Sequence, residues 1–187
     1  MTDARRTTVS KYVSKHLRHA PDAIGLTLGD GGWVPIDALV AAAAERGFRF
    51  TREELDEVVR LCPKQRFAVD SQRQLIRANQ GHSVEVDLAL EPMTPPPLLY
   101  HGTATRFREP ILASGLIKMR RQHVHLSADV ETATTVGKRH GNPVVFAVDT
   151  MSMSRDGFEF FRAANGVWLT DHVPPAYLRE LPSEPTG

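Results

Sequence analysis

The segment 98–127 begins Leu98-Leu99-Tyr100-His101-Gly102-Thr103 and ends Arg121-Gln122-His123-Val124-His125-Leu126-Ser127. An apolar run breaks into His-Gly-Thr at the first end, and polar and apolar residues alternate at the second, so each end predicts a short strand. Because side chains alternate between the faces of a strand, one face of the second strand carries only polar groups: Arg121, His123, His125 and Ser127. We expect this face to line a pocket for a flat, polar anion. The backbone at Gly102 is expected to approach that ligand closely, since glycine has no Cβ.

Strands and helices are expected to alternate after this segment, and a proline cluster precedes it. The pattern predicts helices at 107–114 and 130–138 and strands at 98–101, 121–126, 144–148, 158–161, 167–169 and 177–178. Prolines at positions 92, 95, 96 and 97 are typical of a connection between lobes. We therefore divide the chain into lobes 1–80 and 98–187, joined by a proline-rich seam at 81–97.

The first lobe is predicted to hold three helices and a β-hairpin. The helices are expected at 7–20, at 36–46, and after a capping box that runs from Thr51 to Glu54. Apolar runs at 66–69 and 74–77 flank a polar turn, which indicates the hairpin. This order matches a winged-helix domain, a frequent nucleic-acid binder, and it predicts the α+β class for the whole chain.

A polar stripe follows helical spacing on the first helix: Lys11, Ser14, Lys15 and Arg18. Most stripes of this kind are simply solvated faces. Arg18-His19 stands at the end of the helix, however, where such a pair can point into a neighbouring cleft.

Composition excludes few functions. The chain has 187 residues, 41% hydrophobic and 24% charged, which is ordinary for a globular protein, and its net charge of +1 says nothing about nucleic acid. No apolar run approaches the roughly 20 residues of a membrane helix. The single cysteine, Cys62, cannot form an internal disulfide and is expected as a buried core thiol. We therefore expect a reducing, cytoplasmic location, and a monomer as the default for a two-lobed enzyme.

Several reaction classes fit the sequence poorly. His123-x-His125 has few Cys, Asp or Glu neighbours, so no metal is expected. The chain lacks the Gly-x-Ser-x-Gly elbow of serine hydrolases, a phosphate-binding loop and the Gly-x-Gly-x-x-Gly motif of Rossmann dinucleotide sites. What remains is an excess of arginine and histidine. Arginine forks bind phosphate oxygens and stabilise charge that develops in phosphoryl transfer, so the sequence favours metal-free chemistry at a phosphate.

Six motifs are spread along almost the whole chain: Ser10-Lys11-x-x-Ser14-Lys15-x-Leu17-Arg18-His19-x-Pro21, Lys64-Gln65-Arg66-Phe67, Ile76-Arg77-Ala78-Asn79-Gln80-Gly81-His82-Ser83, Leu99-Tyr100-His101-Gly102-Thr103, Arg121-x-His123-Val124-His125-Leu126-Ser127 and Ala163-Ala164-Asn165-Gly166-Val167-Trp168-Leu169-Thr170. Together they resemble the Tpt1/KptA family of RNA 2′-phosphotransferases. The resemblance implies a winged-helix RNA-binding lobe followed by an NAD-binding β-sheet lobe of the ADP-ribosyltransferase type.

The resemblance also implies a two-step reaction with NAD⁺ as co-substrate. An internal RNA 2′-phosphate attacks C1″ of the nicotinamide ribose, expels nicotinamide and leaves RNA-2′-phospho-ADP-ribose. The ADP-ribose O2″ then attacks that phosphate and releases RNA 2′-OH and ADP-ribose 1″,2″-cyclic phosphate. In organisms whose tRNA splicing leaves a 2′-phosphate at the junction, the expected substrate is that tRNA.

Residue by residue, the resemblance assigns catalysis to Arg18, His19, Arg66 and Arg121. It assigns NAD⁺ binding to His101, Gly102, Thr103, His125, Ser127 and Val167. Basic side chains of the first lobe are expected to hold RNA phosphates: Lys11, Lys15 and Arg77.

Two other functions use similar features. An ADP-ribosyltransferase that modifies nucleic acid or protein would share the NAD-binding lobe, but such enzymes usually carry a Glu that holds the ribose 2″-OH. The matching segment here is Asn165-Gly166-Val167, which has no acid. A non-catalytic winged-helix regulator would have no use for the His-Gly-Thr and His-Val-His-Leu-Ser strands.

Overall fold

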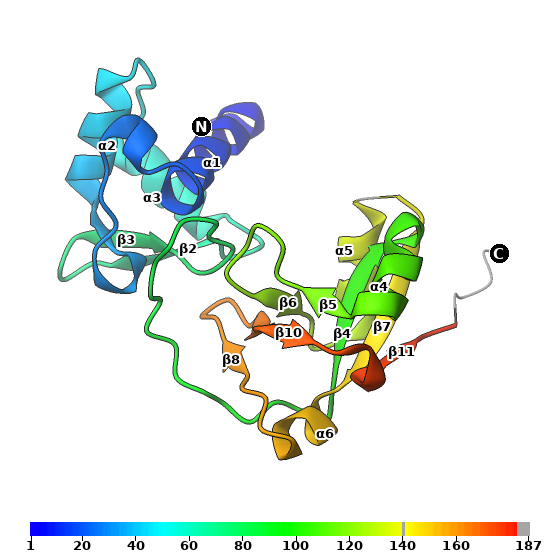
Figure 1. Ribbon diagram of the computed structural model, residues 1–187. Coiled ribbons are helices and arrows are strands. Elements are labelled where there is room, and N and C mark those ends of the chain that lie inside the picture. The colour runs from blue at the N-terminus through cyan, green and yellow to red at the C-terminus, as the bar shows by residue number, and fades with distance from the viewer. Residues whose placement is uncertain (140, 183–187) are drawn as a thin grey trace. The chain divides into compact units, whose positions relative to one another are not determined.

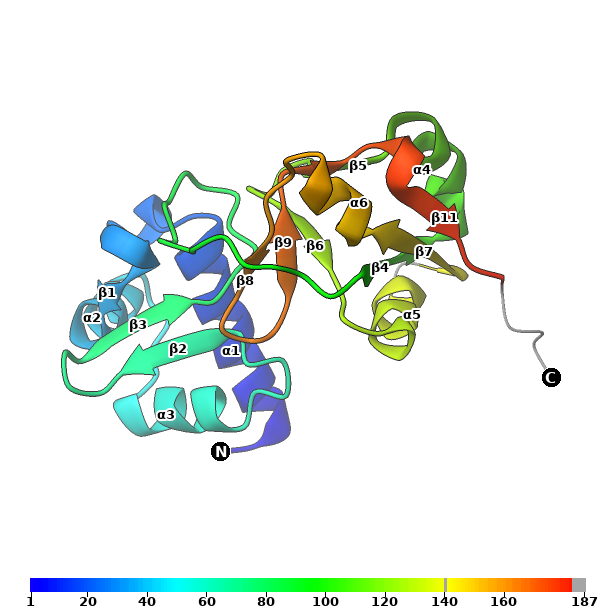
Figure 2. The same ribbon diagram turned by 90° about the horizontal axis from the view of Figure 1, so that it is seen from below.

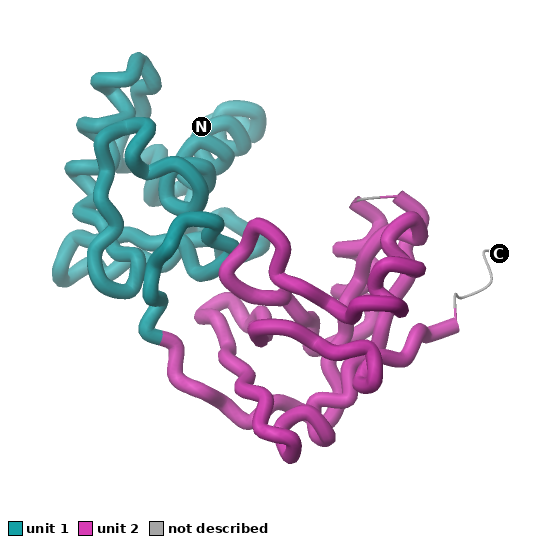
Figure 3. Tube along the Cα trace, in the orientation of Figure 1, with its two compact units in different colours: residues 1–89 teal, residues 90–187 magenta. Residues whose placement is uncertain are grey.

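The computed structural model describes residues 1–139 and 141–182 and divides into two compact units (Figure 3). Unit 1 comprises Met1–Ala89 and unit 2 comprises Leu90–Gly187, so the division falls within the proline-rich stretch 81–97. Each unit combines helices with antiparallel strands around its own apolar core, which confirms the α+β class. The winged-helix and ADP-ribosyltransferase-type assignments of the two lobes stay predictions.

Unit 1 consists of three helices and a three-stranded antiparallel sheet of order β1-β3-β2 (Figure 2). The elements are α1 (Asp3–Arg18), β1 (Val34–Pro35), α2 (Ile36–Glu45), α3 (Arg52–Arg60), β2 (Phe67–Asp70) and β3 (Leu75–Ala78), with short 3₁₀ turns at Asp22–Ile24 and Asp30–Gly32. The three predicted helices and the hairpin are confirmed, as is the capping box, in which the amide of Glu54 donates to Thr51 and the amide of Thr51 donates to Glu54.

The bounds of the first helix differ from the prediction of 7–20. Helix α1 begins at Asp3, because the Thr2 side chain accepts a hydrogen bond from the amide of Arg5 and caps the helix one turn earlier. It ends at Arg18, where the amide of His19 makes the last helical bond to the carbonyl of Lys15.

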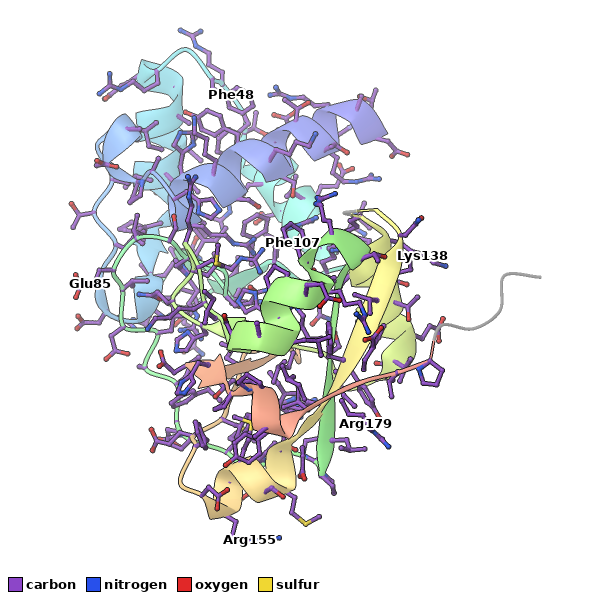
Figure 4. All side chains as sticks on the ribbon, turned by 45° about the vertical axis from the view of Figure 1, so that its right-hand side comes forward. Phe48, Glu85, Phe107, Lys138, Arg155 and Arg179 are labelled. Atoms are coloured by element: carbon purple, nitrogen blue, oxygen red, sulfur yellow. The ribbon has the colours of Figure 1, made fainter. Side chains whose placement is uncertain are left out.

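The core of unit 1 packs against one face of α1. Val9, Val13 and Leu17 are fully buried there, and they share a cluster with Leu39 of α2 and Leu55 of α3. Burying an aliphatic side chain of this size contributes about 1.5–3 kcal/mol, so this face fixes the rotation of α1 about its own axis. The ring of Tyr12, also on α1, stacks on that of Phe48 with 4.0 Å between centroids. Figure 4 labels Phe48 among the side chains drawn as sticks. The opposite, polar face of α1 is left at the surface.

The described residues of unit 2, 90–139 and 141–182, form three small antiparallel sheets and three helices (Figure 1). The sheet β11-β7-β4 comprises β4 (Leu98–Ala104), β7 (Pro143–Asp149) and β11 (Leu178–Glu180). The sheet β6-β9-β8 comprises β6 (Val124–Leu126), β8 (Phe161–Arg162) and β9 (Trp168–Thr170), and the pair β10-β5 joins His172–Val173 to Leu116–Ile117. The helices are α4 (Arg108–Ser114), α5 (Val130–Lys138) and α6 (Thr150–Arg155), with 3₁₀ turns at Thr105–Phe107 and Pro175–Tyr177.

Helix α5 packs against strands β4 and β7, as Figure 1 shows. The contact is closest at Gly102 in β4, where an added Cβ would lie 1.7 Å from the carbonyl oxygen of Ala133 in α5. The expected close approach at Gly102 therefore exists, but the neighbour is the backbone of this helix, and the glycine is required by helix–sheet packing.

Several strand predictions in unit 2 are wrong in extent. The strand expected at 121–126 covers only Val124–Leu126, because the ladder partner β9 offers only Trp168–Thr170. Residues 121–123 precede it in a bend, where the amide of Arg121 donates to the carbonyl of Lys118 at 2.9 Å. The strand expected at 158–161 is reduced to Phe161–Arg162, and β5, α6 and β10 were not predicted. Across the described residues, no helix combines the length and the apolarity that a membrane crossing requires.

Candidate active site

The polar face of α1 forms one wall of a pocket of about 560 Å³ in unit 1. Its lining combines side chains of α1 with the end of α3 and the turn that follows: Arg6, Thr7, Ser10, Lys11, Ser14, Lys15, Arg18, His19, Val58, Leu61, Cys62, Pro63 and Arg66. Five of these residues are Lys or Arg, and none is acidic. The pocket therefore attracts anions.

Helical periodicity explains why these side chains meet. Residues three and four apart lie on one face of a helix, so Ser10, Ser14 and Arg18 follow one another along α1, and Lys11 and Lys15 lie beside them. The buried face of α1 fixes which way this polar face points. Of the residues predicted for the first lobe, Lys11, Lys15, Arg18, His19 and Arg66 are brought together in this one pocket.

The side chain of Arg18 is hydrogen-bonded to the backbone of Arg66. The guanidinium of Arg18 donates to the carbonyl oxygen of Arg66 at 3.3 Å. The buried side chain of Asn79 holds the same turn, because its amide donates to the carbonyl of Gln65 at 2.6 Å while its backbone N–H donates to that of Arg66 at 2.9 Å. Gln65 takes a positive φ of 41°, a conformation that ordinary residues adopt only when their surroundings hold them. These contacts fix the Arg66 backbone at the edge of the pocket.

Cys62 is buried as predicted, but it belongs to the pocket as well as to the core. The guanidinium of Arg66 donates to its sulfur at 3.2 Å, and the amide of Arg66 does so at 3.5 Å. Burial acts to raise the pKa of the thiol, but hydrogen bonds from the amides of Arg66 and Lys64 and the charge of Arg66 together outweigh burial and lower it. Cys62 therefore supports the orientation of the Arg66 side chain.

His19 lies just beyond the last residue of α1 and is held by a loop from the far end of unit 1. Its Nδ1 is 2.8 Å from the hydroxyl of Ser83. The amide of Ser83 also donates to the carbonyl oxygen of Arg18 at 2.9 Å. Next to it, His82 is 1% exposed, and burial followed by the charges of Arg18, His19 and Arg77 lowers its pKa to about 4.

Arg77 does not line the pocket. Its guanidinium lies over the ring of Trp33 at 4.7 Å and donates to the carbonyl oxygens of Gly31 at 3.1 Å and Leu88 at 3.5 Å. These contacts fasten the 3₁₀ turn Asp30–Gly32 and the segment that ends unit 1 to strand β3. They give Arg77 a structural role, and its expected contact with RNA phosphates stays a prediction.

In unit 2, His101 and His125 on two neighbouring strands form the centre of a second polar group. The Nδ1–H of His101 donates to the carbonyl oxygen of His125 at 3.1 Å, because a carbonyl can only accept. Burial and the charge of Arg121 lower the pKa of His101 despite this bond, so the ring is neutral at pH 7 and its Nε2 is an acceptor. The guanidinium of Arg121 donates to Nδ1 of His125, and the neutral tautomer of His125 carries its proton on Nε2.

Ser127 joins this group through the backbone. Its amide donates to the carbonyl of Tyr100 at 2.7 Å, and the amide of Tyr100 donates back at 2.9 Å, so Ser127 lies across from the residue that precedes His101. The sequence placed Arg121 and His125 on one face of a strand. In the structure Arg121 lies outside the strand, yet its side chain still reaches His125 because the bend at 118–121 turns it back.

The remaining predicted residues of unit 2 are less closely grouped. Gly102 and Thr103 are buried in β4, and Gly102 is covered by α5. His123 packs near Phe161 at 5.8 Å between ring centroids, and its pKa is lowered by burial and by Lys118, with Asp171 acting in the opposite direction. Val167 lies in the turn between β8 and β9, where its carbonyl accepts from the amide of Ala163 at 2.9 Å.

The sequence analysis did not select Ser14, Ser83 or Cys62 as site residues, although Ser14 and Ser83 belong to quoted motifs and Cys62 lies two positions before another. The Ser14 hydroxyl is buried in the pocket lining without a hydrogen-bond partner among residues 1–139 and 141–182, so it is available to a bound anion. Within the same described ranges, no three His, Cys, Asp or Glu side chains gather as a metal site would require. The pocket of unit 1 gathers cationic side chains, and the group in unit 2 joins the guanidinium of Arg121 to two imidazoles.

Comparison with known proteins identifies related chains. Residues 4–172 match the family described as RNA 2′-phosphotransferase, Tpt1 / KptA family. A protein named probable RNA 2′-phosphotransferase from Streptomyces coelicolor is 62% identical over 179 residues, which cover 96% of this chain and 97% of the relative. Proteins of the same name from Nostoc punctiforme and Hahella chejuensis are 56% and 50% identical, and the matches cover 97% and 99% of this chain and the whole of each relative.

Proposed function

The chain belongs to the Tpt1/KptA family of RNA 2′-phosphotransferases, and we propose that it removes an internal 2′-phosphate from RNA by transferring it to NAD⁺. The observation that best supports the proposal is the pocket on α1. It gathers Arg18, His19 and Arg66 with two lysines and no acid, a lining suited to a phosphate dianion and to neighbouring phosphates of the RNA backbone. The RNA is expected to be a tRNA with a 2′-phosphorylated splice junction, and the enzyme is expected to act as a monomer.

In the first step, an oxygen of the RNA 2′-phosphate attacks C1″ of the nicotinamide ribose. The C1″–N bond breaks, and nicotinamide leaves with the electron pair. A phosphate monoester is largely dianionic near pH 7, so the nucleophile needs no strong base. The arginines contribute to this step mainly by holding the phosphate in position.

In the second step, O2″ of the ADP-ribose attacks the phosphorus of RNA-2′-phospho-ADP-ribose, and the bond from phosphorus to the RNA O2′ breaks. Negative charge grows on the phosphate oxygens, where Arg18, Arg66 and Arg121 are proposed to stabilise it. The proton of O2″ must be lost and the RNA O2′ must gain one. His19 is the proposed proton carrier, because an imidazole exchanges protons readily near neutral pH.

The NAD⁺ contacts are proposed for unit 2: His101, Gly102, Thr103, His125, Ser127 and Val167. The hydrogen bonds of the two histidines support complementary roles. Nε2 of His101 is an acceptor suited to a ribose hydroxyl, and Nε2–H of neutral His125 is a donor suited to a phosphate or carbonyl oxygen. Gly102 is proposed to act through packing, since α5 covers it.

The test mixes the protein with NAD⁺ and an oligonucleotide that carries one internal 2′-phosphate, and follows RNA and nucleotide products by gel and mass. RNA 2′-OH, nicotinamide and ADP-ribose 1″,2″-cyclic phosphate are the expected products. An RNA that keeps ADP-ribose as a stable end product would instead indicate an ADP-ribosyltransferase, and unchanged RNA would contradict the proposed function.

Arginine variants separate the two steps. Removing one charged hydrogen-bond donor typically costs on the order of 3–4 kcal/mol of transition-state stabilisation, which lowers the rate roughly 10²–10³-fold. Charge grows on the phosphate only in the second step, so Arg66→Ala and Arg121→Ala should slow it more than the first and make RNA-2′-phospho-ADP-ribose accumulate. Arg73→Ala, in the exposed hairpin turn, is the matched control. If nicotinamide release slows equally and no intermediate appears, the arginines serve binding alone.

A further inference from the structure

The loop Gly81–Val84, here called the 81–84 loop, closes the C-terminal end of helix α1. The last carbonyl groups of a helix lack partners within the helix. In this protein the carbonyl oxygen of Arg18 accepts from the amide of Ser83 at 2.9 Å and from that of Val84 at 3.4 Å. A segment more than sixty residues away in the sequence therefore caps the helix at the position of the Arg18-His19 pair.

The 81–84 loop is also held in place by the buried side chain of His82, which packs against the Asp30–Gly32 turn. This side chain is 1% exposed, and an added Cβ on Gly32 would lie 3.7 Å from its Nε2, so the ring fills the space above the Asp30–Gly32 turn. Arg77 holds the same turn through the carbonyl of Gly31 and reaches Leu88 beyond the loop. Ser83 is thus held from two directions, by a buried neighbour and by its own amide.

The hydroxyl of Ser83 then meets the imidazole of His19, with 2.8 Å between Oγ and Nδ1. A ring whose Nδ1 is engaged in this way cannot flip without losing the bond, so its Nε2 keeps one direction. His19 lines the basic pocket on the polar face of α1, and its side chain is exposed at the end of that helix. Without a partner, an exposed side chain of this kind samples several rotamers.

We propose that Ser83 is a positioning residue that holds the ring of His19 through Nδ1, so that Nε2 can accept the proton lost by O2″ of the ADP-ribose and return a proton to the departing RNA O2′. The assignment rests on the proposed function for the identity of the reaction, but the contact itself does not. A hydroxyl is suited to the task, because it can donate to Nδ1 of the neutral ring and accept from Nδ1–H of the imidazolium. A carboxylate in its place would favour the charged ring and hinder the release of its proton.

The first test is spectroscopic and needs no substrate. The ¹⁵N shifts of both ring nitrogens of His19 are measured in the unaltered protein and in Ser83→Ala, with His19→Gln for assignment. Loss of the bond should change the shift of Nδ1 more than that of Nε2, while Ser83→Thr should restore it. Ser71→Ala, at an exposed turn position of unit 1, should change neither. An unchanged Nδ1 shift in Ser83→Ala would refute the positioning contact, whatever the enzyme does.

The second test is kinetic. Ser83→Ala should lower kcat by about 10- to 100-fold, the range that a small misplacement of a reacting group can cost, with KM for RNA and NAD⁺ within about twofold. Ser83→Thr should recover most of the rate. A raised KM for RNA at unchanged kcat would mean that Ser83 contacts RNA directly, and equal loss in the Ala and Thr variants would mean a purely structural role. Either result overturns the proposal. If the unaltered protein itself shows no turnover, the proposed function fails, and the spectroscopic test still decides the contact.

Discussion

Acid should destabilise unit 1 through His82, and replacing this residue by leucine should remove that part of the sensitivity. The imidazole is 1% exposed, and neither ring nitrogen has a hydrogen-bond partner among the described residues. Burial lowers its pKa from 6.5 to about 4, and the charges of Arg18, His19 and Arg77 act in the same direction. The folded protein therefore holds a neutral ring under conditions where the unfolded chain protonates it.

The direction and size of the effect follow from the two pKa values. Between pH 6.5 and pH 4 the unfolded state binds more protons than the folded state, so the stabilisation is complete above this window and is lost as the pH falls through it. The full difference corresponds to about 3 kcal/mol, at 1.36 kcal/mol per pKa unit. Between about pH 7 and pH 5, His82 should lower the free energy of unfolding by about 2 kcal/mol.

The assay is urea unfolding at pH 7 and pH 5, followed by the fluorescence of Trp33 in a Trp168→Phe background, so that only unit 1 is observed. The parent should lose about 2 kcal/mol more than His82→Leu between the two pH values. Other titrating groups of unit 1, such as His16 and Glu54, are present in both proteins and cancel in this difference. His172→Leu, in unit 2, serves as a control that leaves the response of Trp33 unchanged. Equal losses in the parent and His82→Leu would show that the folded protein accommodates a charged His82, and the reasoning from its burial would be wrong.

Three further outcomes are expected. Lys15→Ala should raise KM for RNA and leave KM for NAD⁺ unchanged. The dependence of RNA affinity on salt concentration should weaken by the amount expected for about one lost phosphate contact. A rise in KM for NAD⁺ alone would contradict the assignment of Lys15 to RNA. Turnover should persist in excess EDTA, because arginines are proposed to take the place that Mg²⁺ occupies in most phosphoryl transfers. Activity lost with EDTA and restored by added metal would disprove this. Gly102→Ala should destabilise unit 2 by about 3 kcal/mol or more, measured as a fall in Tm, because its Cβ would overlap the Ala133 carbonyl at 1.7 Å. Gly157→Ala, which has open space, should cost only about 1 kcal/mol of backbone strain, and equal effects would contradict the packing argument.

The sequence alone determined those elements whose signals are local. The buried stripe of α1, the capping box at Thr51 and the hairpin of β2 and β3 all depend on residues within a few positions of one another. Short spacing along a helix also predicted that Lys11, Lys15 and Arg18 share a face. Motif spacing over most of the chain was sufficient to identify the family, because each motif is a contiguous stretch.

The tertiary structure decided what depends on distant partners. Strand β6 extends only as far as β9 can pair with it, and two-residue strands such as β5 exist only because β10 lies alongside. Gly102 was expected to leave room for a ligand, but the space beside it is filled by a helix that follows about thirty residues later.

The contact between His19 and Ser83 shows the same limit within the site. The two residues are 64 positions apart, and neither carries a local signal that points to the other. Their meeting depends on where α1 ends, on the amide of Ser83 reaching the carbonyl of Arg18, and on His82 filling the space above Gly32. Sequence patterns select the residue types that do the chemistry, whereas packing between distant segments fixes the direction in which each side chain points.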